Sequence, residues 1–253
     1  MELIAKNMEI RIGKKEIVKN ISVLVRKQQF VGVIGPNGCG KSTLLKSIYK
    51  SLVPHKGSVF LDDLDVLKTS EKRISQRLGV VGQFNEMNFD LTVQQMVMLG
   101  RTPHKKLLES DKQEDFAIVE EALTRTNLLD YKDRSFLSLS GGEKQRVILA
   151  RTIAQQPKFM ILDEPTNHLD IRYQIEILSC VKELNIGVLA ALHDLEMAAH
   201  YCDYLYAIKY GEVYAHGTPE EVLTPETIEA LYQIKCQTYI NPVTNGLGFA
   251  YRI

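Results

Sequence analysis

The segment that most constrains this chain is residues 35–42, Gly-Pro-Asn-Gly-Cys-Gly-Lys-Ser, which fits the pattern G-x-x-x-x-G-K-[ST]. The apolar stretch before it, residues 30–34, predicts a buried strand, and residues 42–52 after it have the spacing of a helix. A glycine-rich turn between a strand and a helix lets successive backbone N–H groups point at phosphate oxygens, and the positive end of the helix adds to the attraction. We therefore predict a phosphate-binding loop, in which Lys41 reaches the β- and γ-phosphates of a nucleoside triphosphate and the Ser42 hydroxyl ligates Mg²⁺.

Two adjacent acids, Asp163 and Glu164, follow a second strongly apolar stretch at residues 159–162. Parallel α/β sheets bind ligands at the carboxyl ends of their strands, so we expect Asp163 to face the same crevice as the phosphate loop. It would hold Mg²⁺ there, directly or through water. Glu164 is suited to polarise an attacking water as a general base. The alternative is that both acids lie in a surface turn before Pro165.

Composition and charge exclude several classes of protein. Of the 253 residues, 45% are hydrophobic, which is enough for a substantial core and argues against disorder. The 31 Lys and Arg balance the 31 Asp and Glu, and a neutral chain is not expected to hold a nucleic acid backbone. No apolar run approaches the roughly 18–20 residues that span a bilayer, and residues 1–16 lack the apolar segment of a signal peptide. We expect a cytosolic protein.

The cysteines fit a reducing compartment. They are widely spaced, without a C-x-x-C or Cys/His metal pattern, and we expect free thiols at Cys39, Cys180, Cys202 and Cys236. We interpret Cys39 as a small residue that fills a position in the phosphate loop, with a redox-sensitive role as the alternative.

The order of apolar segments predicts a mainly parallel sheet with helices on both faces. Strands are expected near residues 3–5, 17–25, 30–34, 58–61, 78–82, 159–162 and 187–192, and a helix over residues 171–181. Between them, residues 84–156 interleave charged and apolar residues at helical spacing. We expect one domain over residues 1–253, in which residues 1–83 and 157–253 form an α/β lobe and residues 84–156 form an inserted helical subdomain.

A third motif, Leu-Ser-Gly-Gly-Glu at residues 139–143, narrows the family. Ser140 and Glu143 are spaced as a capping box, so a helix with two glycines in its first turn is expected here. Those glycines cost helix stability, roughly 1 kcal/mol each, which suggests a close approach of the backbone to an anion. At this point the sequence resembles the ATP-binding-cassette (ABC) family over essentially its whole length. The resemblance implies an α/β fold, a P-loop NTPase cassette with a RecA-like parallel-sheet core, an N-terminal antiparallel β subdomain and an inserted α-helical subdomain.

The resemblance also implies site roles and two cofactors, ATP and Mg²⁺. The catalytic positions would be Glu164, His193 and Gln83, and the ligands of Mg²⁺ would be Ser42, Gln83 and Asp163. His193 matches the switch histidine that contacts the γ-phosphate, and Asp170 lies in the D-loop. The nucleotide-binding positions would be Gly35, Pro36, Asn37, Gly38, Cys39, Gly40, Lys41, Ser42, Thr43 and Ile12.

In the family, the signature segment closes on the ATP of a second cassette. A head-to-tail dimer with a second copy of this chain is therefore expected, and the signature contacts to the partner's ATP would come from Ser140, Gly141, Gly142 and Glu143. One position departs from the family pattern. Ile12 stands where the family usually has a tyrosine that stacks on adenine, which removes about 1 kcal/mol of stacking and weakens the expected preference for ATP over GTP.

The resemblance is strongest to the ATPase subunits of importers of ferric siderophores, haem and cobalamin. It depends on the T-V-x-x-x-V-x-x-G-R-x-P-H stretch at residues 92–104 and on residues 167–174, 193–199, 217–224 and 241–244. It implies a chain that energises uptake of an iron-siderophore or related metal chelate. The alternatives are import of haem, cobalamin or another substrate, an exporter subunit, or a non-transport ABC ATPase of the soluble, translation-associated kind.

The resemblance to importer ATPase subunits also implies partners. Transmembrane permease subunits would hold the chain at the cytoplasmic face of the membrane, and a periplasmic or lipid-anchored substrate-binding protein would act indirectly; no nucleic acid partner is expected. The stretch after Gln83 can form a groove for a permease helix, with adaptable apolar contacts from Phe84, Met87, Phe89, Met96 and Met98. The alternative for Met96 and Met98 is that they belong to the core of the helical subdomain.

Overall fold

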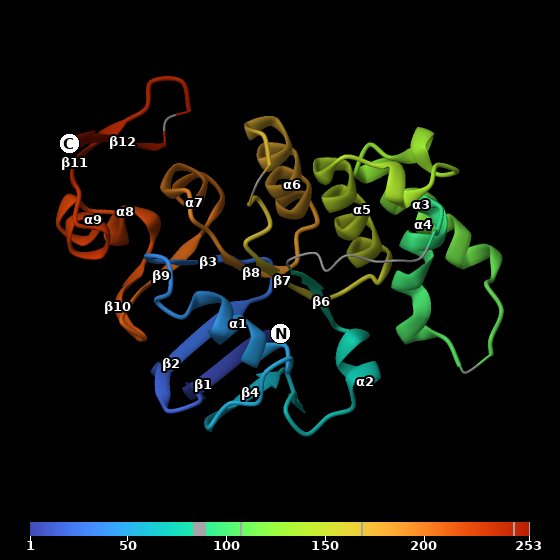
Figure 1. The fold of residues 1–253 in the computed structure, drawn as a ribbon, viewed down its shortest axis with the longest axis horizontal. Helices are drawn as coiled ribbons and strands as arrows, with labels where there is room; N and C mark the ends of the chain where they lie inside the picture. Colours follow the sequence, from blue (N-terminus) through green and yellow to red (C-terminus); the bar gives the residue numbers. More distant parts are fainter. Residues whose placement is uncertain (83–89, 107, 168, 245, 253) are drawn as a thin grey trace.

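The predicted buried strands form one six-stranded sheet at the centre of the molecule (Figure 1). The computed structural model describes residues 1–82, 90–106, 108–167, 169–244 and 246–252. The strands are β3 (Phe30–Ile34), β6 (Leu78–Val81), β7 (Phe159–Asp163), β8 (Gly187–Ala191), β9 (Tyr204–Lys209) and β10 (Glu212–Gly217), in the order β10-β9-β3-β8-β7-β6. Every pairing in this sheet is parallel except that of β10 with β9. The prediction of a mainly parallel sheet is confirmed.

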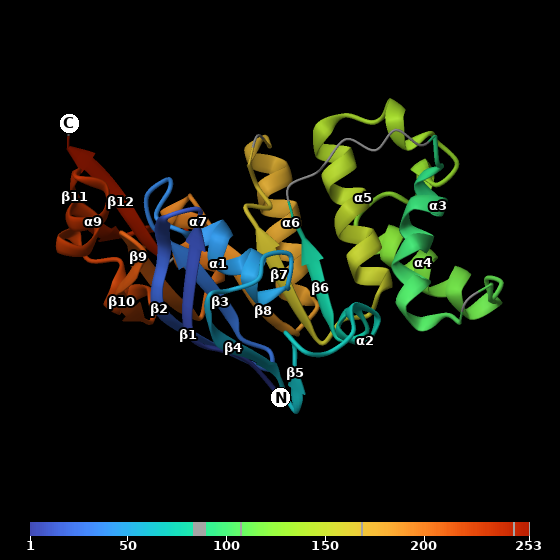
Figure 2. The ribbon, with the colours of Figure 1, turned by 60° about the horizontal axis from the view of Figure 1, so that its bottom comes forward.

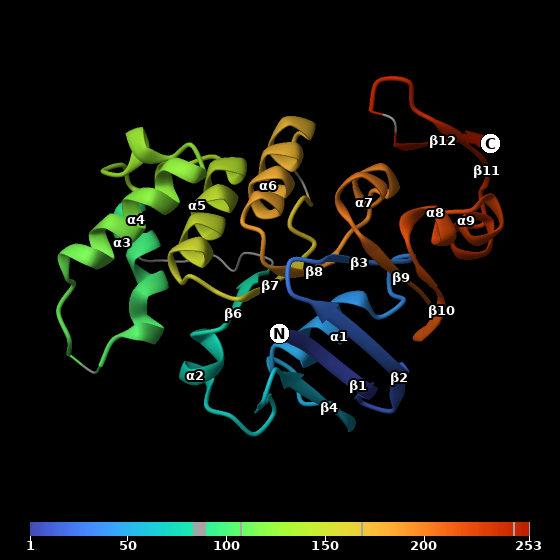
Figure 3. The same ribbon diagram turned by 180° about the vertical axis from the view of Figure 1, so that it is seen from behind.

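Alternating side chains of the central strands enter two different cores. In β3, Phe30 and Ile34 pack with helices α6 (Ile171–Glu183) and α7 (Leu195–Tyr201), which cover one face. Val31 and Val33 pack on the other face with α1 (Lys41–Ile48). Both sides of the sheet are therefore covered, as Figure 3 shows from behind, and this explains why the strands are apolar without alternation.

A second, antiparallel sheet covers the side of α1 that faces away from the central sheet (Figure 2). Its order is β2-β1-β4-β5, with β1 (Glu2–Ile12), β2 (Lys15–Arg26), β4 (Lys56–Leu61) and β5 (Leu64–Asp65). β1 and β2 form a hairpin whose turn contains Gly13 at a φ of 61°. Ile12 lies at this turn, paired with Lys15.

Between β6 and β7, the described residues form several helices and 3₁₀ turns. They are α3 (Val93–Met98), the 3₁₀ turn η1 (Leu99–His104), α4 (Gln113–Arg125), η2 (Leu129–Tyr131), η3 (Phe136–Ser138) and α5 (Gly141–Ala154). α3, α4 and α5 bury Val97, Val119 and Val147 against one another beyond the β6 edge of the sheet. A short helix, α2 (Glu71–Ser75), leads into β6. In the part of the chain that the structure describes, no helix has the length and apolar character that crossing a bilayer requires.

The C-terminal part adds two short helices and a hairpin, α8 (Pro219–Val222), α9 (Pro225–Tyr232), β11 (Lys235–Ile240) and β12 (Leu247–Arg252). Thr218 and Glu221 form the capping box of α8. The helix after the phosphate loop is shorter than predicted, ending at Ile48 instead of residue 52. The reason is that Lys50 adopts a left-handed φ of 65° and the N–H of Ser51 returns to the carbonyl of Lys46 at 2.8 Å.

Candidate active site

The phosphate loop lies at the carboxyl edge of the central sheet, between β3 and α1. Gly35 has a φ of 146°, and a Cβ atom added to it would lie 2.2 Å from the carbonyl oxygen of Ile208 in β9. Gly40 has a φ of 110° and is the N-cap of α1, without a side chain to bond the first helical N–H groups. The glycines thus allow a tight turn and leave an uncapped, positively polarised helix end that can bind a phosphate.

Lys41 is the cation of this loop. Its side chain is buried, with 4% of the residue exposed, and its Nζ donates to the carbonyl oxygens of Gly35 at 2.7 Å and Pro36 at 3.3 Å. These two acceptors use two of the three N–H donors of an ammonium group, and both acceptors are neutral. In the described part of the chain no carboxylate pairs with this ammonium, and a buried, unpaired ammonium favours an anion such as a phosphate.

Asp163, at the end of β7, has the properties of a cation ligand. It is 3% exposed, and its Oδ1 is buried without a hydrogen-bond partner among the residues that the structure describes. Burial raises the pKa of this carboxyl above its usual value, against the opposing effects of the Ser42 hydroxyl and of Lys46 and Lys41. A buried carboxylate oxygen without a partner, next to a hydroxyl, fits a hard divalent cation such as Mg²⁺.

The remaining ligands of such a cation would have to come from outside the acidic side chains. Within the described ranges, no group of three or more His, Cys, Asp or Glu side chains is arranged around a metal position. Gln83, the third predicted ligand, lies outside the described residues.

Glu164 and His193 meet at the same edge. His193 follows β8, which pairs with β7, and its Nε2 lies 2.6 Å from Oε1 of Glu164. The Ser42 hydroxyl lies 3.5 Å from the same carboxylate oxygen. Glu164 adopts a left-handed φ of 56°, which is rare for a residue with a side chain and is typical of functional sites.

The sequence did not single out Asn167 for this cluster. Its side-chain amide donates to Oε2 of Glu164. Asn167 follows Glu164 by only three residues, so the sequence places the two close together. The geometry of the turn was needed to show that their side chains bond.

The signature segment begins helix α5. The predicted capping box is present, with the Ser140 N–H donating to Oε2 of Glu143 at 2.8 Å and the Glu143 N–H donating to the Ser140 hydroxyl at 3.4 Å. A Cβ atom at Gly142 would lie 2.9 Å from the ring of Tyr173 in α6, so packing within the chain explains this glycine. A Cβ atom at Gly141 would meet no described residue within 4 Å. Gly141 is therefore open to a contact from outside the chain.

The structure does not bring every predicted residue to one place. Among the described residues, no hydrogen bond or ion pair joins residues 140–143 to the phosphate loop, Asp163, Glu164 or His193. Asp170 is exposed at the N-cap of α6, and its side chain makes no capping bond. Ile12 is 55% exposed at the β1–β2 turn.

Comparison with known proteins decides the family. A family model described as "ABC transporter" matches residues 18–167, which is more than half of the chain.

The chain belongs to the ABC transporter family.

Curated relatives of this ABC cassette align with nearly all of it. It is 37% identical to the ferric enterobactin transport ATP-binding protein FepC of Escherichia coli, over 94% of this chain and 89% of that protein. It is 38% identical to the probable siderophore transport system ATP-binding protein YusV of Bacillus subtilis, over 94% and 88% of the two chains. It is also 38% identical to the cobalamin import ATP-binding protein BtuD of Halobacterium salinarum, where 98% of this chain spans 63% of the relative. The cassette is an ATPase of this family.

Solved structures agree on the fold. A chain of an inward-facing ABC transporter assigned to the metal-chelate type superposes with a TM-score of 0.85 at 26% identity, over 99% of this chain and 97% of that one. An ATP-binding cassette of an ABC transporter in its ADP conformation gives a TM-score of 0.80 at 26% identity, over 90% and 98% of the two chains. The predicted α/β cassette fold is therefore confirmed, and the cassette binds nucleotide.

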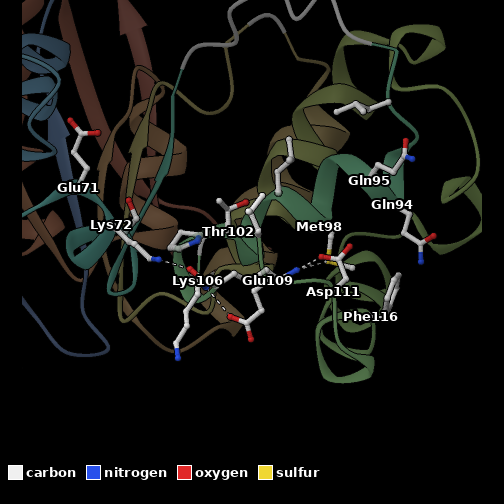
Figure 4. A pocket seen from close by; sticks show the side chains of 16 residues that line it. Glu71, Lys72, Gln94, Gln95, Met98, Thr102, Lys106, Glu109, Asp111 and Phe116 are labelled. Atoms are coloured by element: carbon white, nitrogen blue, oxygen red, sulfur yellow. Dashed lines mark hydrogen bonds and ion pairs between the residues drawn. The ribbon is translucent and has the colours of Figure 1, made fainter.

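A hollow of the cassette lies between α2 and the inserted helices (Figure 4), and its walls contain no residue of the phosphate loop. We call it the α2–η1 groove. Its volume is about 760 Å³, and its walls include Lys72, Leu91, Met98, Leu99, Thr102 and Phe116. Leu99 and Phe116 expose 43% and 44% of their surface, which places apolar side chains in solvent beside charged ones.

Of the residues predicted to form a groove for the permease, some line the α2–η1 groove and others do not. Met98 lines the α2–η1 groove, but Met96 is 1% exposed and belongs to the core, so for Met96 the alternative interpretation is the right one. Phe84, Met87 and Phe89 lie outside the described residues. The sequence did not predict that residues of α2 and α4 line the groove, because these two helices are far apart along the chain.

Proposed function

We propose that this cassette is the ATP-hydrolysing subunit of an importer, and that it energises uptake of an iron-siderophore or a related metal chelate through a separate membrane permease. One observation carries the proposal. The phosphate loop, Asp163 and the Glu164–His193 pair share one crevice, in a chain that aligns almost end to end with ATP-binding proteins named for siderophore transport. Import of haem, cobalamin or another substrate is the second candidate, which the similarity to a cobalamin import protein favours.

In the proposed mechanism, residues 35–43 hold the phosphates of ATP and Ile12 covers the base. Lys41 would exchange its carbonyl acceptors for β- and γ-phosphate oxygens. Ser42, Asp163 and, by proposal, Gln83 would hold Mg²⁺, which when bound withdraws negative charge from the phosphate oxygens.

Glu164 is the proposed general base. Its carboxylate would accept a proton from water while the water oxygen forms a bond to the γ-phosphorus and the bond to the bridging oxygen of ADP breaks. His193 and Asn167 hold the two oxygens of this carboxylate, so they fix its orientation toward the water. By proposal, His193 also contacts the γ-phosphate.

The site is proposed to be completed by a second copy of the chain, arranged head to tail. Ser140, Gly141, Gly142 and Glu143 would close on the ATP held by the other copy, and Asp170 would lie at the same interface. The open surface at Gly141 supports this, because none of the described residues lies close enough to require a glycine there. ATP would bridge the two copies, and its hydrolysis would separate them.

The α2–η1 groove is the proposed docking site of the permease, which would hold the cassette at the cytoplasmic face of the membrane. Its apolar walls and charged rim suit a short amphipathic helix. The division into a lobe of residues 1–83 and 157–253 and a helical part of residues 84–156 is also proposed as functional, since the groove has walls from both. A substrate-binding protein outside the membrane would act through the permease.

The test is transport by the assembled complex. A tagged cassette is purified from membranes with its permease, reconstituted in proteoliposomes with the external binding protein, and assayed for uptake of ferric siderophores, haem and cobalamin. ATP-dependent uptake of a ferric siderophore is the expected result. A cassette that fractionates with ribosomes and without a permease would contradict the proposal.

Matched substitutions test the groove. Leu99→Asp should abolish uptake and spare the ATPase activity of the isolated cassette, because it places a charge in the apolar wall. Ile175→Asp on α6 is the control, since Ile175 is 44% exposed, close to the 43% of Leu99, and does not line the groove. Equal loss of uptake in both variants would contradict the assignment of the groove.

A further inference from the structure

The turn η1 has two sides with different surroundings. Leu99, Thr102 and Pro103 face the α2–η1 groove. Gly100, Arg101 and His104 face the C-terminal end of α5 instead: a Cβ atom at Gly100 would lie 2.1 Å from the carbonyl oxygen of Arg151, and His104 Nε2 lies 2.9 Å from the carbonyl oxygen of Gln155. One six-residue turn therefore separates the groove from the end of α5.

Arg101 joins this turn to two helices. It is 6% exposed, and its Nε donates to Oδ1 of Asp115 in α4 at 2.9 Å. Its Nη1 donates to the last carbonyl of α5, that of Ala154, at 2.9 Å, and to Oε1 of Gln156 at 3.1 Å. A cation at the C-terminal end of a helix is favoured by the helix dipole, and the planar fork of arginine fixes direction as well as distance.

The charge of Arg101 is fully balanced within the chain. Asp115 accepts from Arg101 and from the Lys112 N–H at 3.0 Å, and Lys105 Nζ lies 3.4 Å from its second oxygen. No polar atom of Arg101 or Asp115 is buried without a partner. We call Arg101, Asp115 and the Ala154 carbonyl the η1 joint. It needs no ligand, so its role is to hold elements together.

α5 carries this joint at one end and the signature segment at the other. The helix has 14 residues and, after its first turn, contains neither glycine nor proline. Such a helix is about 21 Å long and resists bending. A displacement of η1 by a molecule in the groove must therefore move α5, and with it Ser140 and Gly141.

From these contacts we infer that Arg101 is a positioning residue, which transmits the presence of the permease in the α2–η1 groove along α5 to the signature segment. The inference rests on the proposed function, because it takes the permease as the occupant of the groove. Arg101 is buried and does not line the groove, so it would act only through η1 and α5.

The decisive variant removes both charges of the joint. Arg101→Met with Asp115→Leu leaves no unpaired buried charge, so the chain should fold. The matched control is Arg125→Met with Glu121→Leu, which removes an exposed Arg–Glu pair of 2.9 Å from the same helix α4. Both variants are compared with the wild type as isolated cassettes and as permease complexes in lipid nanodiscs.

Stimulation of ATP hydrolysis by the permease is the measurement. In the Arg101/Asp115 variant it should fall about tenfold, within the usual range of coupling between sites, while the isolated cassette keeps its rate within about twofold. The control should keep its stimulation. Hydrogen exchange of residues 139–146 gives a second readout, which permease binding should change in the wild type and leave unchanged in the Arg101/Asp115 variant.

A third variant guards against misfolding. Arg101→Lys keeps a positive charge beside Asp115 but cannot bond Asp115 and the Ala154 carbonyl in the same fork, so stimulation should fall about threefold. A folded Arg101/Asp115 variant with full stimulation, or equal loss of isolated and stimulated rates, would overturn the inference. A wild-type complex without any stimulation would instead contradict the proposed function.

Discussion

The cassette contains two buried polar clusters that use similar residue types in opposite ways. In the crevice, Lys41 bonds only neutral carbonyl groups and Asp163 keeps an oxygen without a partner. In the η1 joint, the fork of Arg101 and both oxygens of Asp115 are bonded within the chain. Both acids are buried to a similar degree, with 3% of Asp163 and 7% of Asp115 exposed.

This difference distinguishes a site that can bind a ligand, the crevice, from a cluster that holds secondary-structure elements together, the η1 joint. A buried charge without a partner costs folding energy, and this cost is recovered when a ligand of opposite charge arrives. A balanced cluster gains nothing from a ligand and contributes rigidity. Burial alone therefore does not distinguish the two clusters, whereas the missing partner of Asp163 does.

The largest expected effect is in the crevice. Glu164→Gln removes the proposed base and should lower ATP turnover by about 10²–10⁴-fold, while ATP still binds. The variant should accumulate as an ATP-bound dimer on size-exclusion chromatography. Turnover at the wild-type rate would show that Glu164 is not the base.

The same substitution in both clusters should have unequal costs. Asp115→Asn leaves Arg101 buried without its counter-charge and should lower the free energy of unfolding by about 3–5 kcal/mol. Asp163→Asn removes a charge that has no complete set of partners, and should change that free energy by less than about 1 kcal/mol in the absence of nucleotide. Urea unfolding of the two variants measures both values. Equal losses of unfolding free energy in the two variants would contradict the proposed difference between the clusters.

Removal of Mg²⁺ tests whether Asp163 binds the cation that accompanies the nucleotide. A non-hydrolysable ATP analogue at about a hundred times its dissociation constant should stabilise the wild type by about 2.7 kcal/mol in the presence of Mg²⁺. Chelation with EDTA should reduce this gain in the wild type. In Asp163→Asn the gain should be the same with and without the metal. A metal-dependent gain in that variant would place the cation elsewhere.

The joint should respond to acid. Burial by itself would raise the pKa of Asp115, but the Arg101 hydrogen bond, the Lys112 N–H and the charges of Lys105 and Arg101 outweigh it and lower the pKa to about 2. The stabilisation is then present above the unfolded pKa, near 4, and is lost as pH falls from about 4 to about 2, by at most about 2.5 kcal/mol. Asp111 also pairs with Lys105 in these surroundings. Between pH 4 and pH 2, the free energy of unfolding should change less with pH in the Arg101/Asp115 variant than in the wild type. The same pH dependence in both proteins would contradict the role given to Asp115.

The smallest expected effect concerns the base end of the crevice. Ile12→Tyr adds an aromatic ring at a position that is 55% exposed, and should tighten ATP binding about fivefold through roughly 1 kcal/mol of stacking. Parallel titrations with ATP and GTP measure the effect and the preference. Unchanged affinity for both would mean that the base does not reach this turn.

Some parts of the site were predictable from short segments of sequence. The phosphate loop, the capping box of Ser140 and Glu143, and the apolar strands each depend on neighbours within about ten residues, where propensity and steric limits act directly. The end of α1 was missed because a left-handed Lys50 has no residue signature comparable to glycine. Met96 was ambiguous because helical spacing does not show which side of a helix meets the core.

The sequence by itself determined the family, the chemistry of the phosphate loop and the positions of the acids, since these depend on contiguous residues and local geometry. Only the tertiary structure decided which distant groups complete one another. Ser42 meets Glu164 across 122 positions, and Arg101 meets the end of α5 across 53. Such contacts form because the strands align at one edge and the inserted helices pack on one core. Whether a buried charge is balanced or left open depends on that packing, and so does the difference between the crevice and the η1 joint.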